Sequence, residues 1–237
     1  MKFNWNELEK IGEGSEKDVF ADSHNPDRVI ARFKETEAEN ERQTRGRFYL
    51  SKILHLLLPQ NIPDVHLSAK GGERVMVFGK KNLDEESNEL RKGILRLTEM
   101  KRAGDPRFTE TLKLYKEIRD ALWVKLHSDS NYREFIGRMR RFGVIPDEAP
   151  FNFGYDKEGN LVYLDNEFTP WSITEIFGVL DIRYHFNKKK ISEAISSLNE
   201  RDKERALIYL GRIEKLAEED LGAARTAAKN NKRIDLE

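Results

Sequence analysis

The sequence predicts an α+β protein in which a β-rich part, residues 1–82, precedes a mostly helical part, residues 83–237. Two observations predict this class. Up to about residue 80, short stretches alternate between apolar and polar residues and are separated by Gly, Asn, Asp and Pro, which is typical of strands joined by turns. From residue 84 onward, apolar residues recur mainly every three to four positions, the period of an α-helix.

The β-rich part is expected to contain about five strands and one main helix. Thr36 and Glu39 form the T-x-x-E pattern of a helix capping box, and Pro59 is expected to stop this helix after Leu58. The inward stripe of the helix reads Gln43, Leu50, Ile53, Leu54 and Leu57. Strands are expected over residues 8–14, 19–21, 29–33, 65–68 and 74–78.

The second part is expected to be helical on both sides of a loop and a small hairpin. Helices are expected over residues 84–103, 107–127, 130–142, 174–186, 191–198 and 202–229. Within residues 145–168, a turn at Lys157 to Asn160 is flanked by alternating apolar residues, which is typical of a β-hairpin.

Charge and composition exclude several classes of function. The 42 basic and 42 acidic side chains cancel, so the chain lacks the strong field typical of proteins that bind nucleic acid or membranes. No cysteine occurs, which excludes disulfides, thiolate metal sites and cysteine nucleophiles. The first residues form no signal peptide, and the longest apolar run is far too short to span a bilayer. We therefore expect a cytoplasmic protein with no nucleic-acid or membrane partner.

The stretch IPDEAPFNFGYDKEGNLVYLDNEF places Asp147, Asn152 and Asp165 around one short hairpin. Asn and Asp often only cap turns, and for any one of these residues that is the simpler interpretation. As a set they suit phosphoryl transfer, because the divalent cations that bridge nucleotide phosphates prefer oxygen ligands. Asn152 offers an amide oxygen and Asp165 a carboxylate, and the hairpin is expected to bring the two together.

The spacing D-x-x-x-x-N followed by a strand-borne Asp resembles the catalytic loop and metal-binding motif of the protein-kinase-like fold. The resemblance implies two lobes: an N-terminal antiparallel β-sheet lobe with one main helix (residues 1–82), and a mostly helical C-terminal lobe (residues 83–237) with the catalytic-loop hairpin at 145–168. It implies that Asp147 is the catalytic base and that Asn152 and Asp165 hold metal. It also implies ATP and Mg²⁺ as cofactors and a hydroxyl-bearing acceptor, either a small molecule or a protein.

The run L-D-N-E-F after the hairpin is similar to the I-D-x-E motif of choline-kinase and aminoglycoside-kinase relatives, which implies that Glu167 helps to hold the metal. No long activation segment and no Ala-Pro-Glu motif follow Asp165. The resemblance therefore favours a small, atypical kinase-like phosphotransferase over a regulated Ser/Thr protein kinase.

The segment IGEGSEKDVF resembles the kinase glycine-rich loop G-x-G-x-x-G-x-V. Gly12, Gly14 and Val19 match this pattern, while Lys17 stands where the third glycine usually lies. Glycines allow backbone N–H groups to approach phosphates closely, and the resemblance implies that role here. A plain hairpin turn is the alternative interpretation.

The resemblance implies that a basic residue on the strand at 29–33, or just after it, holds the nucleotide phosphates. Both Arg32 and Lys34 are candidates on one strand face, and Lys34 has the spacing from Gly12 that is usual in kinases. Alternatively, both are solvated cations at a strand end.

Three departures from the kinase pattern favour a second hypothesis. Ile145 replaces the histidine that buttresses the catalytic loop, Lys17 replaces a glycine, and no glutamate lies at the expected place in the main helix. The second hypothesis is a pseudokinase, a nucleotide-binding or protein-interaction module without catalysis. The acceptor has no signature in the sequence.

Overall fold

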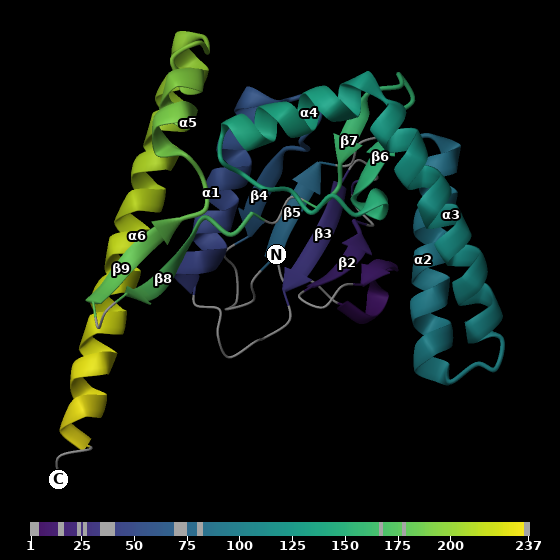
Figure 1. Cartoon of the computed structure of the whole chain (residues 1–237), viewed down its shortest axis with the longest axis horizontal. Coiled ribbons are helices and arrows are strands. Elements are labelled where there is room, and N and C mark those ends of the chain that lie inside the picture. Colours follow the sequence, from purple (N-terminus) through teal and green to yellow (C-terminus); the bar gives the residue numbers. More distant parts are fainter. Residues whose placement is uncertain are drawn as a thin grey trace. The chain divides into compact units, whose positions relative to one another are not determined.

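The computed structural model describes residues 5–13, 17–22, 25, 28–33, 41–68, 75–79, 83–165, 168–176 and 179–234. These residues form an α+β protein, as predicted, with a small antiparallel sheet, two short hairpins and a mostly helical remainder (Figure 1). The chain divides into two compact units. The first comprises Met1–Thr36, Leu58–Arg138 and Pro146–Asn166, and the second comprises Glu37–Leu57, Met139–Ile145 and Glu167–Glu237. The boundary expected at residue 82 stays a prediction.

The first unit contains a five-stranded antiparallel sheet with the order β1-β2-β3-β5-β4. Phe20 and Ile30, which pair across β2 and β3, are buried, and Trp5 and Leu8 pack on them. All five predicted strands are confirmed, whereas Thr36, Glu39 and Arg74 lie outside the described residues. The elements are η1 (Trp5–Glu7), β1 (Lys10–Glu13), β2 (Lys17–Ala21), β3 (Arg28–Phe33), β4 (Val65–Ser68) and β5 (Val75–Gly79).

Three helices follow the sheet in the chain: α2 (Glu85–Ala103), α3 (Phe108–Ser128) and α4 (Ser130–Arg141). The carboxylate of Asp84 caps α2 by accepting the Ser87 N–H, and Gly104 ends α2 in the left-handed conformation at φ 63°. Helices α2 and α3 form an antiparallel pair (Figure 1). The three helices predicted in this region are confirmed, with ends that differ by only one or two residues.

The predicted hairpin within residues 145–168 is also confirmed. A short 3-10 helix, η2 (Pro150–Asn152), leads into β6 (Phe153–Tyr155), which pairs with β7 (Leu161–Tyr163). Helix α2 contacts both β1 of the sheet and β6 of the hairpin, and α3 contacts η2. The hairpin and the 3-10 helix before it therefore pack against α2 and α3 of the first unit.

The second unit is built around two helices, α1 (Glu41–Leu57) and the long α6 (Glu200–Ile234), which pack along each other (Figure 1). The strands β8 (Trp171–Ile176) and β9 (Val179–Tyr184) also contact α6, as does α5 (Lys188–Ile195). The predicted apolar stripe of α1 is confirmed, because its four aliphatic members are buried: Leu50, Ile53, Leu54 and Leu57.

The helix predicted over residues 174–186 is wrong. This region forms the antiparallel pair β8–β9, in which Trp171 lies opposite Tyr184 and Ile176 opposite Val179. The physical reason is a period-two pattern, since exposed and half-buried residues alternate along β9. β-branched residues are frequent on both strands and suit a pleated surface: Ile173, Thr174, Ile176, Val179 and Ile182.

A buried carboxylate joins three elements of the second unit. Asp220 of α6 accepts hydrogen bonds from Nε1 of Trp171 at 3.1 Å, from Nε2 of Gln43 at 3.2 Å and from Nε of Arg42 at 3.2 Å. A buried carboxylate is tolerated when hydrogen bonds and a cation compensate its lost hydration. Gln43, predicted to face inward from α1, thus contacts α6. Among the described helices, none is long and apolar enough to cross a membrane.

Candidate functional site

The β6–β7 hairpin brings Asn152 and Asp165 to one of its ends. Phe153 pairs with Tyr163, and the N–H of Leu164 donates to the carbonyl oxygen of Asn152 at 2.7 Å. Asn152 therefore lies opposite Leu164, and Asp165 is the next residue along the chain. The predicted juxtaposition follows from this register, because residues that precede one strand of a hairpin lie beside those that follow the other.

The opposite end of the hairpin is closed by its own turn. The Asp156 carboxylate accepts the N–H groups of Glu158 at 3.0 Å and Asn160 at 2.7 Å, and Gly159 adopts φ 80°. A left-handed residue is needed there, and glycine adopts it without steric cost. The buried carboxylate of Asp156 is thus occupied by the turn. The turn at residues 156–160 sets the register of β6 and β7. That register places Asn152 and Asp165 at the opposite end of the hairpin.

Asp147 lies beside the same end of the hairpin. Its backbone N–H donates to the hydroxyl of Tyr163 at 3.0 Å, and its carbonyl accepts Nδ2 of Asn152 at 3.2 Å. Its own carboxylate is exposed and accepts the N–H of Ala149 at 3.0 Å. Asp147, Asn152 and Asp165, the three predicted catalytic residues, therefore gather around Tyr163.

Tyr163 lies in an electrostatic setting that opposes ionisation. Burial raises the pKa of its hydroxyl well above the ordinary value, and the negative charge of Asp165 raises it further. The N–H of Asp147 lowers the pKa of Tyr163 by a smaller amount, while the Asp147 and Glu148 carboxylates raise it slightly. Tyr163 therefore stays a neutral hydroxyl, able to accept one hydrogen bond while keeping its own proton.

The oxygen atoms at the Asn152 end of the β6–β7 hairpin suit a hard divalent cation. Because Nδ2 of Asn152 is engaged by the Asp147 carbonyl, the amide oxygen is the atom available to a cation. An amide oxygen and the Asp165 carboxylate match the few protein ligands that Mg²⁺ uses when phosphates and water complete its octahedron. Glu167 lies outside the described residues, among which no group of three or more His, Cys, Asp or Glu side chains is clustered for a metal.

The predicted glycine turn joins two paired strands. Gly12 of β1 pairs with Val19 of β2, and Val19 pairs with Ala31 of β3, so these three positions share one face of the sheet. Gly14 lies outside the described residues.

Arg32 does not share the face of Val19. It follows Ala31 on β3, so its side chain points to the other face, where its guanidinium lies 4.8 Å from the centre of the Trp5 ring. The structure thus separates Arg32 from Gly12 and Val19. Lys34, the preferred candidate, lies outside the described residues.

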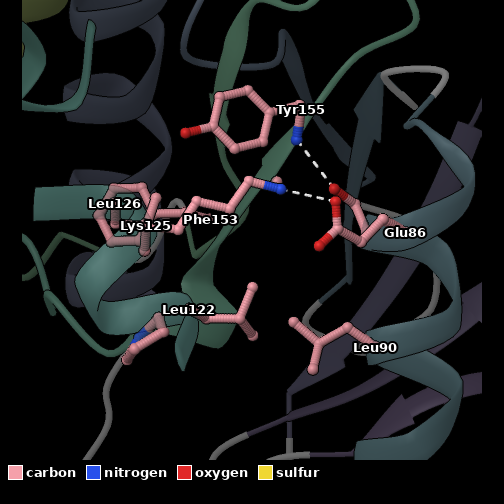
Figure 2. Close-up of a pocket in the computed structure, with 10 residues that line it drawn as sticks. Glu86, Leu90, Leu122, Lys125, Leu126, Phe153 and Tyr155 are labelled. Atoms are coloured by element: carbon pink, nitrogen blue, oxygen red, sulfur yellow. Dashed lines mark hydrogen bonds and ion pairs between the residues drawn. The ribbon is translucent and has the colours of Figure 1, made fainter. Parts of the chain in front are cut away.

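A small pocket lies on the helical side of the hairpin. Figure 2 shows Tyr155 and Phe153 beside Leu90 of α2 and Leu122 and Leu126 of α3. Lys125 closes one side through an ion pair with Glu86 at 2.6 Å, and the Tyr155 N–H donates to Ser87 at 3.0 Å. With about 20 Å³ of free volume, the pocket has room for about one water molecule. Its wall includes none of the three predicted catalytic residues, so this pocket is separate from the predicted site.

Two residues of the site had no functional signal in the sequence. Tyr163 follows the apolar alternation of its strand, a pattern that predicts only a core side chain beneath the loop. Asn61, in the loop after α1, accepts the Tyr163 N–H at 2.8 Å and donates to the carbonyl of Leu161 at 2.8 Å. Such contacts between distant segments have no periodicity that a sequence pattern can reveal.

The chain matches no protein-family model and no curated protein sequence.

Proposed function

We propose that this chain is an ATP- and Mg²⁺-dependent phosphotransferase that transfers the terminal phosphate to a hydroxyl acceptor, on a bilobal kinase-like fold. The observation that carries the proposal is the gathering of Asp147, Asn152 and Asp165 at one end of the β6–β7 hairpin. The five-stranded antiparallel sheet, with α1 placed between β3 and β4 in the chain, supports the same architecture.

Each of these residues then has one chemical role. Asp147 orients the acceptor hydroxyl and takes its proton, which its exposed carboxylate allows. Asn152 and Asp165 hold the cation, and Mg²⁺ when bound neutralises the charge that develops on the transferred phosphate. We assign Glu167 to the same cation.

The β1–β2 hairpin is assigned to the nucleotide. Gly12 and Gly14 place backbone N–H groups near the phosphates, and Val19 lies on the same sheet face as Gly12. Lys34 is assigned to the phosphates in preference to Arg32, because Lys34 has the spacing from Gly12 that is usual in kinases and the Arg32 guanidinium stacks on Trp5. In this proposal the enzyme acts in the cytoplasm on ATP and a hydroxyl acceptor, without a nucleic-acid or membrane partner.

One observation favours the second candidate, a pseudokinase that binds nucleotide without catalysis. The Asp147 carboxylate and the Asn152 amide are both engaged within their own loop, at 3.0 Å and 3.2 Å. A base must exchange such an internal hydrogen bond for one with the acceptor. A module without catalysis needs no such exchange.

Phosphoryl transfer to a panel of acceptors distinguishes the two candidates. The purified chain is incubated with Mg²⁺ and ATP labelled at the terminal phosphate, together with a serine peptide, an aminoglycoside, choline or a simple sugar. We expect labelled product with at least one acceptor, and none with the Asp165→Ala variant. Binding of Mg²⁺·ATP without any transfer or hydrolysis supports a nucleotide-binding pseudokinase. No binding at all refutes the phosphotransferase and favours a protein-interaction module without catalysis.

A further inference from the structure

We propose that Tyr163 is a positioning residue that fixes the base, Asp147, relative to the metal ligand, Asp165. The inference rests on the proposed phosphotransferase function. Tyr163 lies two residues before Asp165 on the same strand, and its hydroxyl accepts the backbone N–H of Asp147 at 3.0 Å. One side chain thus connects the segment that bears the metal ligand with the loop that bears the base.

The ring of Tyr163 is held from two sides. It is 1% exposed, and its centroid lies 5.7 Å from that of Phe135 in α4 and 5.1 Å from that of Phe153 in β6. Buried aromatic rings at these distances interlock and seldom change rotamer. The hydroxyl therefore has a fixed place in space, which an anchor for a loop requires.

The backbone of Tyr163 is held as well. On the edge of β7 away from β6, Asn61 accepts the Tyr163 N–H and donates to the Leu161 carbonyl, both at 2.8 Å. Asn61 thus engages two alternate residues of β7, as a third strand would. Since both edges of β7 are paired, the path from Tyr163 to Asp165 has little freedom.

The hydroxyl of Tyr163 reaches the loop that bears the base by accepting the Asp147 N–H. A phenylalanine at this position keeps the ring packing with Phe135 and Phe153 and removes the bond to Asp147. Loss of that bond frees the loop next to the base, and misplacement of a reacting group by about 1 Å costs up to about 100-fold in rate. Metal ligation by Asn152 and Asp165 needs no contribution from the hydroxyl.

The experiment combines Tyr163→Phe with Asp147→Asn in a double-mutant cycle. Steady-state release of inorganic phosphate from Mg²⁺·ATP, with water as acceptor, gives kcat, and calorimetry gives the Kd of Mg²⁺·ATP. We expect Tyr163→Phe to lower kcat about 10- to 100-fold and to change Kd by less than about 2-fold. In the Asp147→Asn background, the same substitution should change kcat by less than about 2-fold.

Tyr155→Phe is the matched control. Tyr155 is in the same hairpin, and its hydroxyl donates to Asp129 at 2.5 Å, away from Asp147. We expect this control to lose stability without losing kcat. Equal losses of kcat in the two Phe variants, or the same loss from Tyr163→Phe in both backgrounds, would mean that Tyr163 only stabilises the fold.

Hydrogen exchange of the Asp147 amide separates failure of this inference from failure of the proposed function. We expect the amide to exchange faster in Tyr163→Phe than in the wild type, whether or not the chain is active. Unchanged exchange overturns the positioning role alone. A wild-type chain that binds no Mg²⁺·ATP overturns the proposed function, and a role for Tyr163 in its catalysis with it.

Discussion

Trp171 lies directly over Gly46 of α1. A methyl group added to Gly46 would come within 2.5 Å of Cη2 of the Trp171 indole and 2.8 Å of Cγ of Pro170. Trp171 is fully buried, and its Nε1 donates to Asp220 of α6 at 3.1 Å, so the ring has no room to move aside. The glycine thus allows one side chain to join α1, β8 and α6.

We expect Gly46→Ala to lower the free energy of unfolding by about 3 kcal/mol or more, because overpacking of a rigid contact forces backbone shifts. Urea denaturation followed by far-UV circular dichroism measures the change. Gly211→Ala in α6 is the matched control, since a methyl group there meets no atom within 4 Å. The control should raise stability by about 0.5–1 kcal/mol. A Gly46→Ala protein as stable as the control would contradict the packing described here.

Asp165→Ala should abolish Mg²⁺-dependent nucleotide binding and leave the fold intact. In the proposed site, the Asp165 carboxylate is one of two oxygen ligands to the cation. Its removal also eliminates a negative charge beside the buried Tyr163. Stability without metal should therefore be unchanged or slightly higher. Calorimetry with Mg²⁺·ATP and circular dichroism measure the two effects. The control is Glu158→Ala, which removes the same charge from the hairpin turn and should bind nucleotide normally. An unfolded Asp165→Ala protein would show that Asp165 has a structural role instead.

Asp147→Asn should keep the affinity for Mg²⁺·ATP and lower turnover by about two to four orders of magnitude, the usual cost of removing a general base. The amide has the same shape, and the hydrogen bond from the Asp147 N–H to Tyr163 does not depend on the side chain. The measurement is phosphate transfer to the best acceptor of the panel, with calorimetry in parallel. Asn152→Ala should differ by weakening metal binding and turnover together. Equal loss of nucleotide affinity in both variants would place Asp147 among the metal ligands.

At high pH the unfolded state should gain stability relative to the folded state because of Tyr163. Burial raises the pKa of this hydroxyl above the ordinary value near 10, so the neutral form is favoured in the folded state. The contribution of Tyr163 to the free energy of unfolding is complete below pH 10. It is lost as the pH rises from there towards the folded-state pKa. Absorbance at the tyrosinate band should reveal tyrosines that ionise well above pH 10 in the folded protein, with Tyr163 and Tyr155 among them, and Tyr163→Phe should remove one of these. Ionisation of all tyrosines near pH 10 in the folded protein would contradict the burial.

The sequence predicted the elements whose patterns are local. The strands of the first unit, the apolar stripe of α1 and the turn at Gly159 follow from period, propensity and turn chemistry within a few residues. The pair β8–β9 was missed because Glu175 interrupts the apolar alternation of β8, and because the letters of the two strands also fit a helical spacing. Tyr163 and Asn61 were missed as site residues for another reason: Asn61 contacts Leu161 across 100 positions of the chain. Only the fold brings such side chains together.

The most direct test of the account is a calorimetric titration of the wild-type chain with ATP, with and without Mg²⁺. In the proposed site, Asn152 and Asp165 would supply oxygen ligands at one end of the hairpin, so nucleotide should bind through the cation that they would hold. We predict binding with Mg²⁺, weaker binding by at least about tenfold without it, and loss of this dependence in Asp165→Ala. Equal binding with and without Mg²⁺, or no binding at all, would contradict the account.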